Sequence, residues 1–181
     1  MMRVLIAHGA SGKAGSMQAH VAGLEARGFA ATAVDLPLRQ AERAVPVYRE
    51  HVDAQAETPA ELAIGGQSYG GRVASLLAAE TLPSCAALIC FSYPLHRPGH
   101  QDWEVRSRHW PTIDVPVRLL SGESDPFARL DLLQRAIDER LPAARLVTWP
   151  KVGHSLKSVL DEALDAAAGF LRDVGASNAP R

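Results

Sequence analysis

The chain has 181 residues, of which 47% are hydrophobic and 22% are charged, and it carries a formal net charge of -1 with a pI near 6.7. This length is typical of one domain that buries a sizeable core without disulfides or metals. The charge supplies no broad positive field for a phosphate backbone, which argues against nucleic-acid binding, and no apolar run is long enough to span a bilayer.

Apolar runs of four to seven residues recur along the chain with helical patterns between them, as expected for a parallel sheet with crossover helices. We expect strands at residues 3–7, 30–35, 61–65, 86–92, 115–121 and 145–149. We expect helices at residues 16–27, 46–55, 69–81, 129–140 and 155–174. This predicts a single α/β domain over residues 1–175, a three-layer fold with a mostly parallel sheet of about six strands and helices on both faces, followed by a frayed tail at 176–181.

Two local features bear on the compartment. The apolar run at residues 4–7 is too short for a secretory signal and no small-residue cleavage site follows it, which predicts a cytoplasmic protein. Cys85 and Cys90 are the only cysteines, and Cys90 lies inside an apolar run. We therefore expect free buried thiols rather than a disulfide.

Gly66-x-Ser68-x-Gly70 lies between a predicted strand and an Ala/Leu-rich helical pattern. A serine on a tight turn between a strand and a helix is exposed to substrate, and glycines two positions away let neighbouring backbone pass closely. The pattern predicts a nucleophile elbow with Ser68 as the nucleophile.

A serine hydroxyl needs a base and a group that orients the base. Asp125 and His154 follow the next two predicted strand ends in the order Ser, Asp, His, which is the order of the α/β-hydrolases. Glu123 is the nearest rival to Asp125 as the acid. Each residue also has a simpler interpretation, as a junction residue, a turn former or a neighbour of a helix N-terminus. Three matches in order favour a catalytic triad, because the ends of parallel strands meet at one edge of the sheet.

An acyl-transfer site also needs donors for the oxyanion. The N–H of Tyr69, directly after the nucleophile, is one candidate, and the N–H of Ala10 in the loop after the first strand is the other, with Gly9 allowing close approach. His8 is expected to position this loop rather than to act as a second base. His8, Gly9 and Tyr69 are candidate pocket residues.

Residues 93–116 form the longest stretch without clear periodicity. Trp103 and Trp110 in this segment are further pocket candidates, if the loop walls or covers the site; alternatively they pack on the body of the domain. The three histidines of the segment lack regular ligand spacing, so we expect no metal site there.

The first loop supports a rival hypothesis. Gly9-x-x-Gly12-x-x-Gly15 follows a strand and opens a helix, and Asp35 stands at the next strand end, as in a dinucleotide-binding fingerprint. This pattern favours an NAD(P)-dependent oxidoreductase but leaves the three triad matches unexplained. A P-loop is excluded because Ala7 and Ala14 replace required residues. A third possibility is a hydrolase fold that binds a partner without turnover.

The chain resembles the small α/β-hydrolases of the Tex30/KANL3 type and the dienelactone-hydrolase type over nearly its whole length. The resemblance rests on five segments: His8-Gly9-Ala10, residues 65–72, residues 91–96, Gly122-x-x-Asp125-Pro126-Phe127 and Gly153-His154-Ser155. It implies a compact hydrolase without a large cap domain, but no particular substrate. The glycine-rich first loop and the segment 93–116 depart from the pattern.

Together these observations predict a serine hydrolase in which Ser68, His154 and Asp125 cleave a small carboxylic ester or thioester through an acyl-enzyme. The mechanism requires no cofactor or metal. The expected partner is a small-molecule acyl substrate, with no nucleic acid and no membrane.

Overall fold

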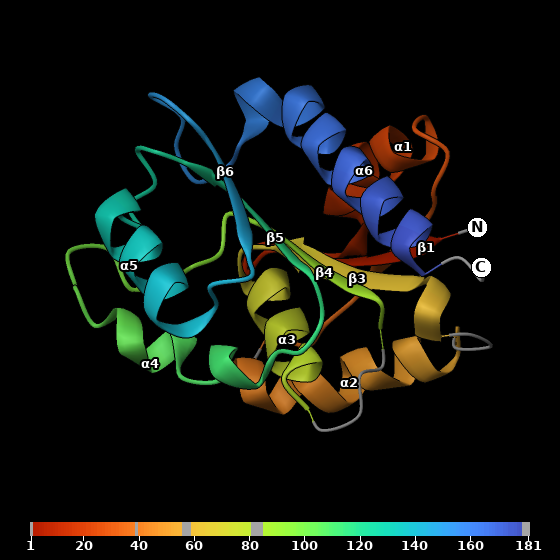
Figure 1. Ribbon diagram of the computed structural model, residues 1–181, viewed down its shortest axis with the longest axis horizontal. Helices are drawn as coiled ribbons and strands as arrows, with labels where there is room; N and C mark the ends of the chain where they lie inside the picture. The colour runs from red at the N-terminus through yellow and green to blue at the C-terminus, as the bar shows by residue number, and fades with distance from the viewer. Residues whose placement is uncertain (1, 39, 56–58, 81–84, 179–181) are drawn as a thin grey trace.

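Six strands form one sheet in the computed structural model of the chain, which describes residues 2–38, 40–55, 59–80 and 85–178 (Figure 1). The strands are β1 (Arg3–Ala7), β2 (Ala30–Val34), β3 (Leu62–Gln67), β4 (Ala87–Phe91), β5 (Val117–Gly122) and β6 (Arg145–Trp149). Their order is β2-β1-β3-β4-β5-β6 and every neighbouring pair is parallel. All six strands therefore end at the same edge, as the sequence predicted.

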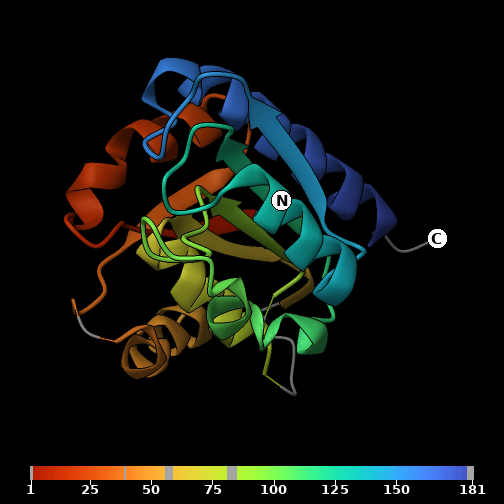
Figure 2. The ribbon, with the colours of Figure 1, turned by 90° about the vertical axis from the view of Figure 1, so that its left-hand side faces the viewer.

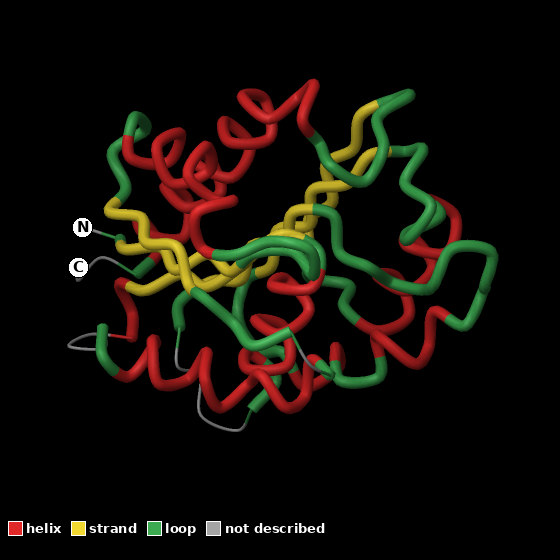
Figure 3. The backbone as a smooth tube through the Cα atoms, turned by 180° about the vertical axis from the view of Figure 1, so that it is seen from behind, coloured by secondary structure: helices red, strands yellow, loops and turns green. Residues whose placement is uncertain are grey.

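Helices cover both faces of this sheet. Helices α1 (Gln18–Glu25) and α6 (Leu160–Ser177) lie on one face, and α2 (Ala41–Asp53), α3 (Tyr69–Ala78) and α5 (Leu130–Arg140) on the other (Figures 1 and 2). The short α4 (Trp103–Ser107) lies beside α5. The view from behind in Figure 3 shows the same three layers. The remaining helical turns are of the 3-10 type: η1 (Ala14–Met17), η2 (Pro59–Glu61), η3 (Trp110–Thr112) and η4 (Lys157–Val159).

The two faces of the sheet bury separate apolar clusters. In β1, Leu5 and Ala7 contribute to the cluster under α2, α3 and α5, whereas Val4 and Ile6 contribute to the cluster under α1 and α6. This alternation follows from the two-residue period of a strand. Every residue of β4 is buried, as expected for a central parallel strand covered on both faces. The α/β prediction is confirmed.

Some predicted boundaries were wrong. Helix α2 begins at Ala41 rather than at residue 46, and Pro46 lies inside it. The missing proline N–H costs one helical hydrogen bond, but burial of Tyr48 and Val52 on the core-facing side outweighs that loss. The last helix begins at Leu160 rather than at 155 and continues to Ser177, so part of the predicted tail is helical. Residues 179–181 of that tail, and residue 81 of the predicted third helix, lie outside the described residues.

The strand order reverses direction between β1 and β3, and we call the region at the carboxyl ends of these two strands the crevice. The chain leaves β1 toward β2 over the α1 face and leaves β3 toward β4 over the α3 face. Loops that depart to opposite sides leave an opening at the carboxyl ends of the two strands, where α/β proteins bind ligands. Ser68 directly follows β3, and His8 directly follows β1.

Candidate active site

Ser68 occupies a strained turn between β3 and α3. Its φ of 50° and ψ of -114° are rare for a residue other than glycine, and strain of this kind persists only where the surroundings hold it. The Ser68 N–H donates to the carbonyl of Phe91 at 2.8 Å, which ties the turn to the end of β4. The local geometry is that of the predicted nucleophile elbow.

The glycines around Ser68 are required by close packing against the end of β1. A Cβ at Gly66 would lie 2.6 Å from the carbonyl oxygen of Ala7, and a Cβ at Gly70 would lie 2.4 Å from the same atom. Real Cβ atoms do not approach backbone oxygens so closely. The two glycines therefore allow β3 and α3 to pack closely against the end of β1, which places Ser68 next to the loop that follows β1.

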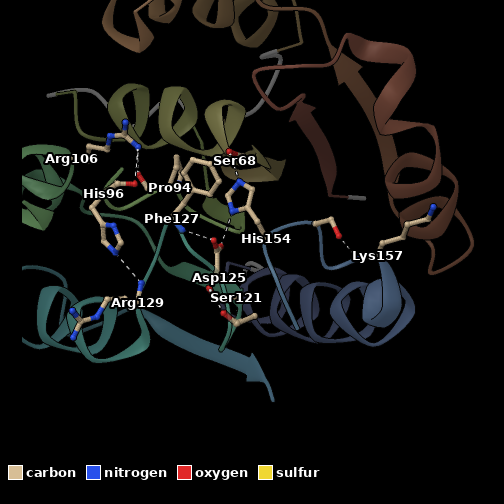
Figure 4. Close-up of polar contacts among 12 residues, drawn as sticks. Ser68, Pro94, His96, Arg106, Ser121, Asp125, Phe127, Arg129, His154 and Lys157 are labelled. Atoms are coloured by element: carbon tan, nitrogen blue, oxygen red, sulfur yellow. Dashed lines mark hydrogen bonds and ion pairs between the residues drawn. The ribbon is translucent and has the colours of Figure 1, made fainter. Parts of the chain in front are cut away.

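Ser68, His154 and Asp125 form a continuous hydrogen-bonded chain (Figure 4). The Nε2 atom of His154 lies 2.8 Å from Ser68 Oγ, and its Nδ1 atom lies 2.7 Å from Asp125 Oδ2. The Asp125 side chain is fully buried, whereas that of His154 is 23% exposed. An ionised carboxylate only accepts hydrogen bonds, so Nδ1 donates to Asp125 and Nε2 accepts from the Ser68 hydroxyl. This tautomer lets the imidazole take a proton from the serine.

A tight turn fixes the carboxylate of Asp125. Its second oxygen, Oδ1, accepts the N–H of Phe127 at 2.8 Å, and the Phe127 ring lies 4.5 Å from the His154 ring between centroids. A Cβ at Gly122 would lie 2.2 Å from the carbonyl oxygen of Val152, which shows how closely this turn packs against the segment that carries the histidine. We call residues 122–128 the acid turn. Glu123, the rival acid, instead accepts a hydrogen bond from Thr148 at the surface.

His96 joins the acid turn to the loop after β4, a role that the sequence analysis missed. Its backbone N–H donates to the Phe127 carbonyl at 3.0 Å, and its Nε2 atom accepts a hydrogen bond from the backbone N–H of Arg129 at 3.0 Å. Because Nε2 accepts, Nδ1 carries the proton and donates to the Arg97 carbonyl at 2.8 Å. The only signal in the sequence is that this histidine follows closely after a buried strand.

The loop after β1 lies against the nucleophile. A Cβ built at Gly9 would be 3.8 Å from the Cβ of Ser68, and within the described residues the Ala10 N–H makes no hydrogen bond. Tyr69 is the first residue of α3, and its hydroxyl donates to the Pro37 carbonyl at 2.7 Å. The structure thus brings the two proposed oxyanion residues to the same crevice as Ser68.

His8 is buried and holds this loop in place. Its Nε2 atom accepts the N–H of Leu36 at 3.0 Å, and its Nδ1 atom donates to the Gly9 carbonyl at 2.8 Å. Both ring nitrogens are therefore engaged with backbone, which agrees with the expectation that His8 positions the loop. Its side chain is 1% exposed and offers a substrate almost no surface.

The prediction that Trp103 and Trp110 line a pocket needs correction. Both side chains belong to the packed core and are almost fully buried. The guanidinium of Arg140 lies 4.8 Å from the Trp103 ring, and the Trp110 ring lies 5.1 Å from that of Tyr93. Residues 103–112 therefore pack on the body of the domain through α4 and η3, which is the alternative that the sequence left open.

The dinucleotide hypothesis finds no support in the geometry of the first loop. Asp35, which would bind the ribose, instead accepts the N–H of Ala14 at 2.6 Å. A Cβ at Gly15 would meet no atom within 4 Å, and one at Gly9 would make only ordinary contacts, so neither position needs glycine for close packing. Gly12 is the tightly packed glycine of the three, and the atom that its Cβ would meet, at 2.4 Å, is Ser16 Oγ of the same loop, so Gly12 and Asp35 serve the packing of the loop itself.

Other reactive groups take no part in the hydrogen-bonded chain of Ser68, His154 and Asp125. Cys85 and Cys90 are free and buried, as predicted, and burial raises the pKa of the Cys85 thiol to about 12. Over the described ranges, no group of three or more His, Cys, Asp or Glu side chains could hold a metal ion. In the same part of the chain, no helix combines the length and apolar character needed to cross a membrane.

The fold and this constellation define an α/β-hydrolase-type protein. The family described as alpha/beta hydrolase domain matches residues 1–168, and the chain belongs to that family. The predicted resemblance is thereby confirmed at the level of the superfamily.

Among curated proteins, the chain is 30% identical over 140 residues to an uncharacterized protein of Mycobacterium tuberculosis, matched in two strains. The match covers 69% of this chain, and the chain spans about half the length of these relatives, 50%.

Solved structures give the same fold. A monoacylglycerol lipase of Paleococcus ferrophilus superposes with a TM-score of 0.81 at 14% identity, covering 95% of this chain and 94% of the lipase. A dienelactone hydrolase of Anabaena variabilis superposes with a TM-score of 0.78 at 18% identity, covering 96% of this chain and 86% of the dienelactone hydrolase. An esterase of Pyrococcus furiosus superposes with a TM-score of 0.78 at 15% identity, covering 95% of this chain and 80% of the esterase. These TM-scores establish a shared fold.

Proposed function

We propose that the chain is a serine hydrolase that cleaves a carboxylic ester or thioester of modest size through an acyl-enzyme. The observation that carries the proposal is the hydrogen-bonded chain from Ser68 through His154 to Asp125, at 2.8 Å and 2.7 Å. These distances lie within the hydrogen-bond reach that a nucleophile and its general base require. Membership of the α/β-hydrolase family supports the same chemistry.

The residues divide the reaction into two acyl transfers. Ser68 Oγ attacks the acyl carbon while His154 Nε2 takes the hydroxyl proton, and the resulting imidazolium is stabilised by the buried carboxylate of Asp125. The tetrahedral intermediate collapses when His154 returns the proton to the leaving oxygen or sulfur. Water, deprotonated by the same imidazole, then attacks the acyl-enzyme and releases the acid.

The oxyanion of each intermediate needs two donors in the crevice. We assign them to the backbone N–H groups of Tyr69 and Ala10, one at the start of α3 and one in the loop after β1. Donors fixed by the backbone require no reorganisation as charge develops on the oxygen. His8 supports this arrangement because its two ring nitrogens fix the loop after β1 through hydrogen bonds to the backbone of Gly9 and Leu36.

The test is hydrolysis of p-nitrophenyl esters and matching thioesters of increasing acyl length. We expect the wild type to turn over the short members and Ser68→Ala to lose at least about 10⁴-fold in kcat/KM. Ser155→Ala is the matched control, since Ser155 is an exposed serine next to His154, and among the described residues its hydroxyl accepts a hydrogen bond only from the Lys157 N–H, at 3.4 Å. Turnover that survives in a folded Ser68→Ala variant, or is absent from the folded wild type across both series, contradicts the proposal.

A further inference from the structure

A second polar depression lies at the catalytic edge of the sheet. It encloses about 630 Å³ and draws its lining from the start of α2, from α3 and from the segment after β4. The lining residues are Gln40, Glu42, Arg72, Arg97, Asp102, Val105, Arg106 and Arg108. Four arginines against two carboxylates give the lining a formal charge of +2.

The acids of the lining do not neutralise its arginines. Glu42 pairs with Arg72 at 2.6 Å, which leaves Asp102 as the remaining carboxylate. Arg97 and Arg108 are exposed, and neither forms an ion pair with any residue that the structure describes. The two guanidinium groups are thus available to an anion from outside the chain.

The inner part of the depression is also rich in positive charge. Arg72 Nε is buried without a hydrogen-bond partner within the described chain. Burial, reinforced by the positive charges of Arg72 and Arg97, lowers the pKa of Arg106. Guanidinium groups that repel one another in this way gain from an anion placed between them.

This depression is connected to the nucleophile through two elements. Arg72 lies one turn after Ser68 on α3, and its backbone N–H donates to the Ser68 carbonyl at 3.0 Å. Side chains of a helix lean toward its N-terminus, so the Arg72 side chain leans toward the serine end of α3. Arg106 Nη1 donates to the Pro94 carbonyl at 2.9 Å, on the segment that follows the strand holding the Ser68 turn (Figure 4).

We propose that this depression, the arginine subsite, binds an anionic group, a carboxylate or a phosphate, on the substrate of the hydrolase. The proposal rests on the proposed function and names the class of substrate, an acidic ester or thioester whose charge is separated from the scissile bond. The planar fork of a guanidinium matches both anions through paired N–H donors. Val105, 52% exposed in the lining, offers an apolar surface to a short spacer between the charge and the acyl group.

A matched pair of substrates tests the subsite. The mono-p-nitrophenyl ester of adipic acid carries the anion, and p-nitrophenyl methyl adipate is its neutral counterpart with the same leaving group. We compare the ratio of their kcat/KM values in the wild type, in the double variant Arg97→Gln/Arg108→Gln, and in Arg145→Gln. Arg145 begins β6 at the opposite edge of the sheet and is exposed, so its variant controls for the loss of one positive charge away from the subsite, half of the change in the double variant.

A binding arm tests the subsite without turnover. Adipate and inorganic phosphate are titrated by calorimetry into Ser68→Ala, with and without the two arginine substitutions. The anion that binds more tightly tells whether carboxylate or phosphate is the preferred group.

We expect the wild type to have a higher kcat/KM for the charged ester than for the neutral one. The ratio of the two values should fall about tenfold in the double variant, roughly threefold for each exposed contact, and should stay unchanged in Arg145→Gln. Adipate or phosphate binding should weaken by a similar factor, and added salt should lower the ratio. If the neutral ester is hydrolysed but neither the ratio nor anion binding depends on the arginines, the subsite is refuted and the hydrolase stands. If neither ester is hydrolysed, the proposed function fails and with it the substrate class, and the binding measurements decide what is left: arginine-dependent binding keeps the depression as an anion site, and its absence refutes that as well.

Discussion

Replacing Asp125 by Asn tests how the buried carboxylate orients the base. In the native protein each carboxylate oxygen has its own donor, Phe127 N–H for Oδ1 and His154 Nδ1 for Oδ2. An asparagine that keeps its oxygen toward Phe127 turns its NH₂ group toward His154. The imidazole then accepts at Nδ1 and carries its proton on Nε2, so it cannot deprotonate Ser68.

The size of the effect follows from these contacts. Turning the amide the other way restores the competent tautomer but sets two buried donors against each other, at a cost of about 1–3 kcal/mol. Replacing the charge-assisted bond to the developing imidazolium by a neutral one removes about 1.5–3 kcal/mol more. Together they raise the barrier by about 2.5–6 kcal/mol, which is about 10²- to 10⁴-fold in rate.

The assay is kcat/KM for the best p-nitrophenyl ester, with folding checked by thermal unfolding. Asn fills the same volume and satisfies the Phe127 N–H, so the melting temperature should change little. Glu123→Gln is the matched control, because that carboxylate bonds Thr148 at the surface and should be replaceable within about twofold. A folded Asp125→Asn variant that retains more than a tenth of wild-type activity would refute the assigned role.

Three further predictions concern packing at Gly70, the pH dependence of stability, and the positioning role of His96. Gly70→Ala would place a Cβ 2.4 Å from the Ala7 oxygen and should lower the free energy of unfolding, measured in urea, by more than about 2 kcal/mol. Gly169→Ala is the control and should not destabilise the fold, because a Cβ there meets no atom within 4 Å. Equal stabilities of the two variants would contradict this reasoning. Burial lowers the pKa of His20 from 6.5 to about 4, so the unfolded chain binds the extra proton first and stability falls by roughly 3 kcal/mol as pH drops through that window. His20→Leu should flatten this slope in urea titrations, and an unchanged slope would show that other groups cause it. His96→Phe removes the acceptor beside the acid turn and should lower kcat about tenfold, with His96→Gln recovering part of it; variants equal to wild type in kcat would deny His96 a positioning role.

The sequence predicted the fold and the approximate place of the site for a definite reason. Parallel strands end at one edge of a sheet, so Ser68, Asp125 and His154 could be assigned to one region from their positions after apolar runs alone. The continuous apolar runs of the central strands, as in the fully buried β4, placed them to within two residues. Neither inference needed a long-range contact.

The remaining features depend on tertiary packing. Helix α4 has five residues, too few for a periodic signal, so the burial of Trp103 could not be read from the sequence. His96 acts through Arg129, 33 residues away, and the arginine subsite joins Arg72 to a segment that begins 25 residues later at Arg97. Pairings of this kind follow from how the loops pack, and no local pattern encodes them.

The most direct test of the account is whether Ser68 is an activated nucleophile. The wild type, Ser68→Ala and His154→Ala are incubated with a fluorophosphonate probe and examined by intact mass and peptide mapping. The account predicts a single adduct on Ser68, none in Ser68→Ala, and a strongly slowed reaction in His154→Ala. A folded wild type that stays unmodified, or an adduct on another residue, would contradict the claim that this triad performs acyl transfer.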